Sequence, residues 1–165
     1  MTARVAVVGA AESSRIGVVP DMSTLQLSCD AATAAIRDSG IEASEIDGIA
    51  SLGEPPITVA HALGITPSWV DSTVVGGASA LFHVRHGMAA ISAGLCRVVL
   101  VTHGGSGRSR RAGESFALPT GISPEGQFEV PYGTSGAATK LTLGVARFLH
   151  ETGTTEEQLA SVAVA

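Results

Sequence analysis

The stretch Asp71-Ser-Thr-Val-Val-Gly-Gly-Ala-Ser-Ala-Leu-Phe82 decides how this chain folds, because a strand, a tight turn and a helix follow one another within it. The two glycines permit a sharp turn, and the start of the following helix favours negative charge. Enzymes seat reactive side chains at such junctions, where a cysteine would be activated as a thiolate. Val74 and Val75 stand here instead, so the stretch has the form of an active-site turn without its nucleophile. The alternative is a glycine-rich turn that only packs a helix on a sheet.

Strands and helices alternate on both sides of this turn. Short apolar runs predict buried strands, and apolar residues three or four apart predict amphipathic helices. Capping-box spacings join Ser23 to Gln26 and Thr154 to Glu157. The alternation predicts an α/β fold with right-handed βαβ units, a mostly parallel sheet and helices on both faces. The expected strands are residues 4–8, 46–50, 69–75 and 97–102, and the expected helices are residues 23–39, 57–63, 78–93 and 135–151.

Two later stretches depart from this alternation. Residues 104–134 are rich in Gly, Ser, Arg and Pro and show no period, which predicts a long loop excursion with a binding or lid function. Residues 159–165 form an apolar alternation with no polar tail. Because natural termini are more often polar and frayed, we interpret the end of the chain as a cut through a larger protein.

Composition narrows the class of protein. The 165 residues are 45% hydrophobic and only 15% charged, which indicates one domain with a large shared interface. The net charge of −5 speaks against a nucleic-acid partner. No apolar run approaches the roughly 20 residues of a membrane span, and the N-terminus reads as a strand rather than a signal peptide. We therefore expect a cytoplasmic protein.

The cysteines and histidines give no metal or nucleophile pattern. Cys29 falls on the apolar stripe of a helix and Cys96 at the start of a strand, so we interpret both as small core residues. His83 and His86 lie three apart on a helix with no third ligand in reach, so we interpret them as interface or surface residues. His103 follows a buried strand, where α/β folds bind ligands, and it is a candidate to line a substrate pocket.

Three stretches together resemble the N-terminal half of a thiolase-superfamily protein. The turn resembles the pattern Cys-x-Ser-Gly-x-x-Ala, with Gly77 and Ala80 at its last glycine and alanine. Residues 91–103 resemble a helix end and strand of that fold, and residues 129–133 with 146–160 resemble the stretch before its second domain. The similarity is greatest to the lipid-transfer-protein or sterol-carrier branch, which includes members without the nucleophile.

This resemblance implies an acyl-CoA-handling protein whose nucleophile position is Val74. A valine side chain has no lone pair, so a Cys-dependent thiolase reaction at this turn is excluded. Members of this kind include aldolase-type enzymes that draw their acid and base groups from the second half of the fold. The resemblance further implies a homodimer in which the strand around residues 72–75 pairs with its twofold mate, and an OB-fold partner protein.

Coenzyme A enters this interpretation as part of the substrate, and no covalently bound cofactor or metal is expected. The loop Gly104-Gly-Ser-Gly-Arg-Ser-Arg-Arg111 joins backbone amides to three arginines, which suits the phosphates of coenzyme A. A solvated loop is the alternative. The candidate substrate-binding residues are Val75, Gly76, Gly77, His103, Arg108, Arg110 and Arg111.

Three functions remain open from sequence. The chain is an aldolase-type or lipid-transfer-type member that acts with a C-terminal half, a noncatalytic acyl-CoA or lipid-binding module, or an inactive fragment. The acyl chain or steroid that it takes, the direction of its reaction and the identity of its partner are not encoded in any motif found here.

Overall fold

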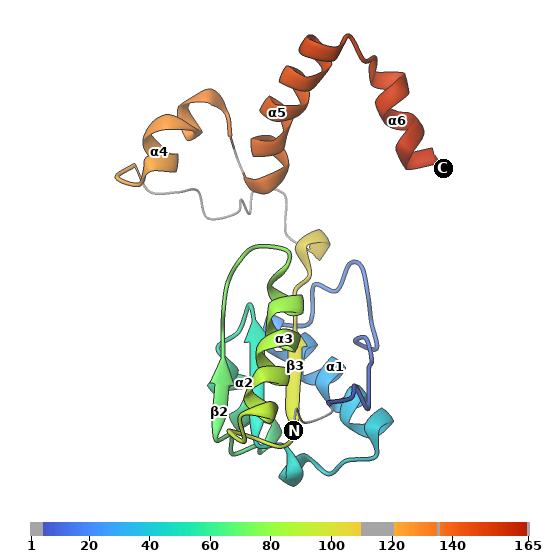
Figure 1. Cartoon of the computed structure of the whole chain (residues 1–165), viewed down its shortest axis with the longest axis vertical. Coiled ribbons are helices and arrows are strands. Elements are labelled where there is room, and N and C mark those ends of the chain that lie inside the picture. The colour runs from blue at the N-terminus through green and yellow to red at the C-terminus, as the bar shows by residue number, and fades with distance from the viewer. Residues whose placement is uncertain (1–4, 110–120, 135, 165) are drawn as a thin grey trace. The chain divides into compact units, whose positions relative to one another are not determined.

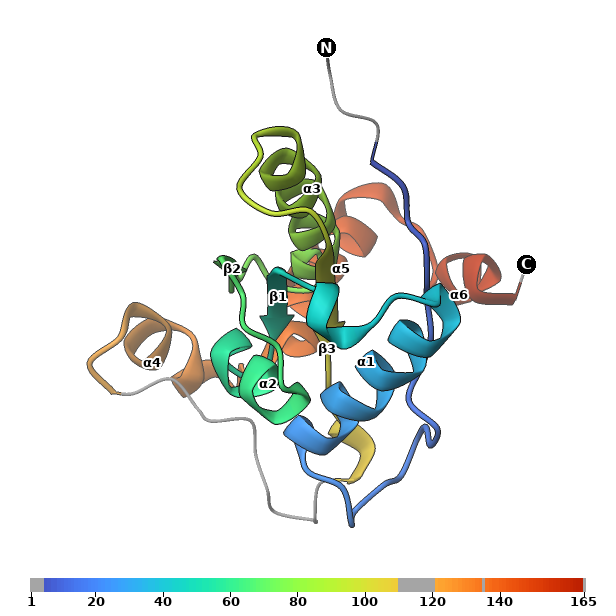
Figure 2. The same cartoon turned by 90° about the horizontal axis from the view of Figure 1, so that it is seen from below.

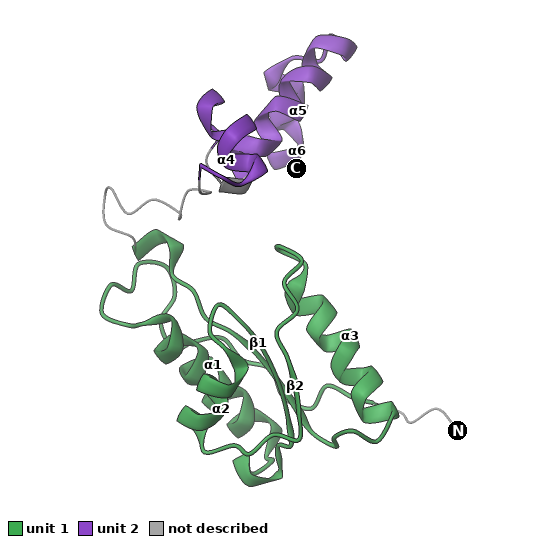
Figure 3. Ribbon diagram, turned by 90° about the vertical axis from the view of Figure 1, so that its left-hand side faces the viewer, with its two compact units in different colours: residues 1–110 green, residues 111–165 purple. Residues whose placement is uncertain are grey.

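A computed structural model describes residues 5–109, 121–134 and 136–164 (Figure 1). The chain forms two compact units, residues 1–110 and residues 111–165 (Figure 3). The first holds the sheet and the second is helical. Each is described by itself.

The first unit is built on a parallel sheet of three strands in the order β2-β1-β3. The strands are β1 (Gly48–Leu52), β2 (Trp69–Asp71) and β3 (Val99–His103). Gly48 of the central strand pairs with Trp69 on one side and Val99 on the other. Ile49 and Ala50 are fully buried, as expected for a strand covered on both faces. The parallel α/β fold predicted from the sequence is confirmed.

Helices cover both faces of this sheet, α1 (Thr24–Ser39) and α2 (Pro56–Leu63) on one and α3 (Ser79–Ser92) on the other (Figure 3). Local chemistry sets their ends. Ser23 and Gln26 form the predicted capping box at the start of α1, and Gly40 ends that helix in the left-handed conformation. Figure 2 shows the sheet between α3 and the pair α1 and α2, from below.

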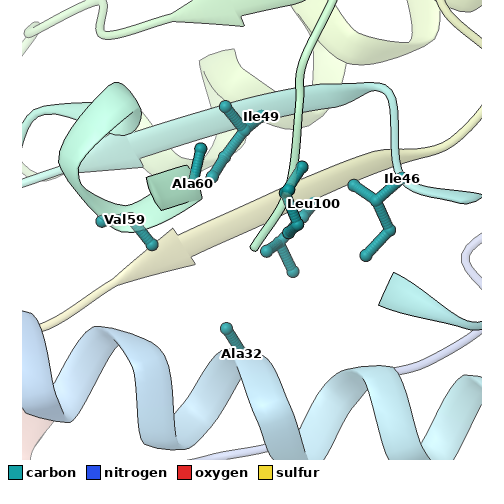
Figure 4. Packing of buried hydrophobic residues seen from close by; sticks show 7 residues of the cluster. Ala32, Ile46, Ile49, Val59, Ala60 and Leu100 are labelled. Atoms are coloured by element: carbon teal, nitrogen blue, oxygen red, sulfur yellow. The ribbon is translucent and has the colours of Figure 1, made fainter. Parts of the chain in front are cut away.

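The hydrophobic core of this unit lies between the sheet and the helices α1 and α2 (Figure 4). Each buried aliphatic side chain contributes about 1.5–3 kcal/mol relative to its exposed state. The cluster consists of Ala32, Ile46, Ile49, Val59, Ala60, Ile65 and Leu100.

The second unit contains α4 (Pro124–Phe128), α5 (Gly136–Thr152) and α6 (Glu156–Val164). It also contains a short 3-10 turn at Val130–Tyr132. Two further 3-10 turns, at Ala43–Glu45 and Gly107–Ser109, belong to the first unit. The predicted loop 104–134 is therefore partly helical where the structure describes it. The predicted cap of α6 is off by one residue, because Thr155 and Gln158, rather than Thr154 and Glu157, bond each other's backbone amides.

Two predicted strands differ from the structure. Residues 5–8 lie in no strand, because no neighbouring strand among the described residues pairs with them, and Arg4 lies outside those residues. The strand predicted over 69–75 ends at Asp71, and beyond it Val75 makes only a single bridge to Gly77. In the described residues no helix combines the length and apolar character needed to cross a membrane.

Candidate functional site

The turn after β2 is held at its start by the carboxylate of Asp71. One oxygen, Oδ1, accepts hydrogen bonds from the backbone N–H (2.9 Å) and the hydroxyl (2.7 Å) of Thr73. The other, Oδ2, lies 2.7 Å from Nδ1 of His86 on α3. Burial raises the pKa of Asp71, but the hydrogen bonds from Thr73 and His86 outweigh it, so the pKa lies below its ordinary value. Asp71 is therefore an ionised anchor that ties the turn to α3.

His83 is the buried centre of this arrangement. Its side chain is only 1% exposed, which corrects our interpretation of His83 as an interface or surface residue. Nε2 lies 3.0 Å from the carbonyl oxygen of Thr73. Because a carbonyl oxygen can only accept, Nε2 carries the proton and donates it. His83 thus holds the turn in place through this hydrogen bond from the buried side of α3. The side chain of His86, in contrast, is 41% exposed.

The far end of the turn is closed by Ser79, the first residue of α3. Its buried hydroxyl accepts a hydrogen bond from the backbone N–H of Val75 (2.9 Å) and donates one to the carbonyl of Gly76 (2.7 Å). Gly76 has a φ of 75°, a left-handed conformation that favours glycine. The turn is therefore fixed by side-chain hydrogen bonds at both ends.

Val74, which the sequence resemblance aligns with the nucleophile position, is 71% exposed at this turn, and Val75 is 47% exposed. Neither cysteine has the lowered pKa of an activated thiol. Burial raises the pKa of Cys29 and of Cys96, and the nearby carboxylates of Glu54 and Asp47 raise them further. Both thiols stay protonated at neutral pH, in keeping with their interpretation as packing residues.

A second structured region lies at the carboxyl end of β3. Gly104 is packed so tightly on α1 that a Cβ there would lie 2.3 Å from the carbonyl oxygen of Thr24. Next to it, the hydroxyl of Thr102 donates to the carbonyl of Ser28 (2.9 Å). These contacts fix the strand end against the first turns of α1.

A cavity of about 310 Å³ opens beside this strand end. His103 lines it, as do Gly104 and Ser106, and Glu12 and Arg15 face it from the segment that precedes α1. The hydroxyl of Ser106 donates to the carbonyl of Gly17 (3.1 Å), and the hydroxyl of Ser109 accepts from the backbone N–H of Val19 (2.5 Å). The cavity therefore joins an imidazole, a guanidinium and a carboxylate at the sheet edge where α/β folds bind ligands.

The predicted binding residues fall into two groups. Val75, Gly76 and Gly77 share the turn after β2, whereas His103 and Arg108 follow β3, on the other side of the central strand. Arg108 is exposed, and Arg110 and Arg111 lie outside the described residues. Their binding roles remain predictions. Within the described part of the chain, no group of three or more His, Cys, Asp or Glu could hold a metal ion.

Sequence reasoning missed the residues that hold these loops in place. Asp71 and Thr73 have the spacing of an Asx turn, in which a carboxylate bonds the backbone two residues on, and that signal is readable from the sequence. Ser79 bonds only to Val75 and Gly76, three and four residues before it, so its role was also open to a local reading. The roles of Ser106 and Ser109 depend on contacts with residues about 90 positions away, which no local pattern encodes.

No family model matches the chain. A steroid side-chain-cleaving aldolase of Thermomonospora curvata is 30% identical over 178 aligned positions, which cover 98% of this chain and 43% of the relative. A 17-hydroxy-3-oxo-4-pregnene-20-carboxyl-CoA lyase of Mycobacterium tuberculosis is 29% identical over 154 positions, which cover 87% and 39%.

Among solved structures, an Ltp2-ChsH2(DUF35) aldolase superposes with a TM-score of 0.68 and 28% identity, covering 91% of this chain and 40% of that one. A monomeric SCP2-thiolase-like protein of Mycobacterium smegmatis matches with a TM-score of 0.49 and 30% identity, over 57% of this chain and 22% of that one. The chain spans about two fifths of the length of the curated relatives.

Proposed function

Since this chain belongs to the thiolase superfamily, in its lipid-transfer-protein branch, we propose that it forms the N-terminal half of an aldolase-type enzyme. Its substrate is a coenzyme A thioester with a hydroxyl group on the carbon β to the thioester carbonyl. The named relatives make a steroid side chain the first candidate for the acyl group.

One observation carries this proposal. The chain is related over 98% of its length to a side-chain-cleaving aldolase, and its turn presents an exposed valine where an acyl-transfer enzyme needs a cysteine. Aldol cleavage requires no acyl-enzyme. A base removes the hydroxyl proton, the carbon–carbon bond breaks to leave a carbonyl, and the bonding electrons pass to the thioester α-carbon, which an acid then protonates. The base and the acid come from the remaining half of the enzyme.

This chain contributes binding surface to that reaction. We assign the phosphates of coenzyme A to Arg108, Arg110 and Arg111 with the glycine-rich loop around them. His103 lies at the cavity beside the same loop and can donate or accept a hydrogen bond there. We assign the acyl group to the turn of Val75, Gly76 and Gly77, because its exposed valine and glycines offer an apolar surface.

The proposed assembly has further members. Among the described residues the outer edge of β2 has no strand partner, which supports pairing of the segment around residues 72–75 with a second copy of the chain to give a homodimer in the cytoplasm. An OB-fold protein is the proposed partner, supported by the two-component name of the related aldolase structure.

The test is to produce the chain together with its remaining half and the partner protein, and to follow 17-hydroxy-3-oxo-4-pregnene-20-carboxyl-CoA by mass spectrometry. We expect a new carbonyl product and a shorter acyl-CoA in equal amounts. Turnover should survive Cys29→Ala and Cys96→Ala. Loss of turnover with either variant would contradict a mechanism without a cysteine nucleophile.

A variant of the proposed phosphate-binding residues separates substrate binding from catalysis. Replacing Arg108, Arg110 and Arg111 together by Ala should raise KM more than it lowers kcat, because these side chains are proposed to hold a part of the substrate that does not react. If acyl-CoA binds but no carbon–carbon bond is cleaved, the chain is a noncatalytic binding module instead.

A further inference from the structure

Residues 10–19, here called the strap, form neither helix nor strand, yet they are held against α1 (blue beside α1 in Figure 2). The backbone N–H of Ala10 donates to a carboxylate oxygen of Asp38 (3.0 Å). The backbone N–H and the hydroxyl of Ser14 both donate to Oδ2 of Asp30 (2.6 and 2.7 Å). Two carboxylates of α1 therefore hold the first half of the strap.

The second half of the strap is bonded to the loop after β3. The hydroxyl of Ser106 donates to the carbonyl oxygen of Gly17 (3.1 Å). The backbone N–H of Val19 donates to the hydroxyl of Ser109 (2.5 Å). Arg108 stands between these two serines in the sequence. The strap and the loop that carries Arg108 therefore lie side by side.

Arg15 lies on the strap between these two sets of hydrogen bonds, and it lines the cavity of about 310 Å³ beside the end of β3. Its Nη1 lies 2.5 Å from Oδ2 of Asp21, and the two side chains are 50% and 61% exposed. An ion pair as exposed as this one contributes little to stability, because water screens both charges. A guanidinium has five N–H donors, and the remaining donors of Arg15 have no partner within the described chain. Arg15 can therefore bind an anion from the cavity.

The same end of the cavity offers an anion further donors. His103 and Ser106 line it together with Arg15, and Arg108, whose side chain is exposed, follows Ser106 by two residues. Among the described residues that line the cavity, only Glu12 is acidic. Arginine binds phosphate through two parallel N–H···O bonds, which select for geometry as well as for charge. The side chains at this end therefore favour a phosphate group held between the strap and the loop.

We propose that Arg15 and Arg108 together bind the 3′-phosphate of the coenzyme A thioester. This inference rests on the proposed function, which assigns the phosphates of coenzyme A to the loop after β3, and it adds a residue from the strap to that site. The 3′-phosphate is a terminal monoester with three acceptor oxygens, so it can engage two guanidinium groups at once. The hydrogen bonds of the strap to α1 and to the loop hold Arg15 in place for this contact.

The experiment is a calorimetric titration of coenzyme A, and of dephospho-coenzyme A, which lacks the 3′-phosphate, into the chain assembled with its remaining half and its partner protein. The wild type should bind coenzyme A at least about tenfold more tightly than dephospho-coenzyme A. Arg15→Gln should weaken the binding of coenzyme A by about tenfold and change that of dephospho-coenzyme A by less than about twofold, because only coenzyme A carries the group that Arg15 contacts.

Two results would overturn the inference and leave the proposed function standing. One is equal affinity of the wild type for the two compounds. The other is an Arg15→Gln variant that changes both affinities equally or changes neither. Failure of the wild-type assembly to bind coenzyme A at all would contradict the proposed function as well.

Two further variants control for general effects of charge. Arg85→Gln removes an exposed arginine from α3, which covers the face of the sheet opposite α1, and should change neither affinity. Glu12→Gln removes the acidic residue of the cavity and should tighten the binding of coenzyme A by about twofold, since a carboxylate repels a phosphate. Weaker binding of coenzyme A by Glu12→Gln would mean that the ligand donates to this carboxylate, and it would overturn the assignment of a phosphate.

Discussion

The turn after β2 and the loop after β3 both leave the carboxyl end of a parallel strand, yet they are held in place by different means. The turn, residues 71–79, depends on the polar side chains of Asp71, His83 and Ser79. The end of β3 depends on a missing side chain, because Gly104 allows the backbone to touch α1. The turn is therefore held by polar partners around the exposed Val74, whereas the strand end is held by the absence of a side chain.

Removing the centre of the polar scaffold should have the largest effect. His83→Ala deletes a buried side chain and leaves the carbonyl of Thr73 without its donor, at a cost of about 3 kcal/mol in unfolding free energy. Urea unfolding followed by the fluorescence of Trp69, the single tryptophan, measures this in the first unit. His61→Ala on the exposed part of α2 is the control and should change stability by less than about 0.5 kcal/mol. Equal losses in both variants would contradict the scaffold role of His83.

Adding a side chain at the end of β3 should have the next largest effect. Gly104→Ala forces a methyl group within 2.3 Å of the carbonyl of Thr24, and neither backbone can move without disturbing the sheet or α1. We expect a loss of about 2 kcal/mol in the same urea experiment. Gly105→Ala is a matched control, since the nearest atom to its Cβ would be 3.8 Å away. A stable Gly104→Ala variant would mean that this contact does not fix the strand end.

Breaking the ionic anchor of the turn should cost less and should depend on pH. Asp71→Asn weakens the contacts to Thr73 and His86 and should cost about 1 kcal/mol at neutral pH. Because the folded-state pKa of Asp71 is lowered, its stabilisation is present above the unfolded value of about 3.9 and is lost as the pH falls through the folded pKa. Wild-type and Asp71→Asn stabilities, measured from pH 7 down to pH 3, should therefore converge at the acidic end. A constant difference would show that the charge of Asp71 contributes nothing.

The same contrast explains how much could be read from the sequence. Helices α1, α2 and α3 and the parallel sheet follow from periodicity, caps and glycine stops, which are local signals. The burial of His83 was missed because its partner, the carbonyl of Thr73, lies ten residues away and carries no side-chain signal. The strand predicted over residues 4–8 was wrong where the structure describes it, because a strand needs a neighbour and pattern alone cannot supply one.

The smallest change in stability is expected at Val74, the position that the sequence resemblance aligns with a nucleophile. Val74 is 71% exposed, so Val74→Cys should alter the unfolding free energy by less than about 0.5 kcal/mol. The new thiol would lie near the N-terminus of α3, which favours the thiolate, whereas burial raises the pKa of Cys29 and Cys96. Iodoacetamide at neutral pH should therefore modify Val74→Cys once and leave the wild type unmodified, as intact mass would show. Modification of the wild type at either native cysteine would contradict the raised pKa of those thiols. An unreactive Val74→Cys would mean that the turn is not open to a substrate.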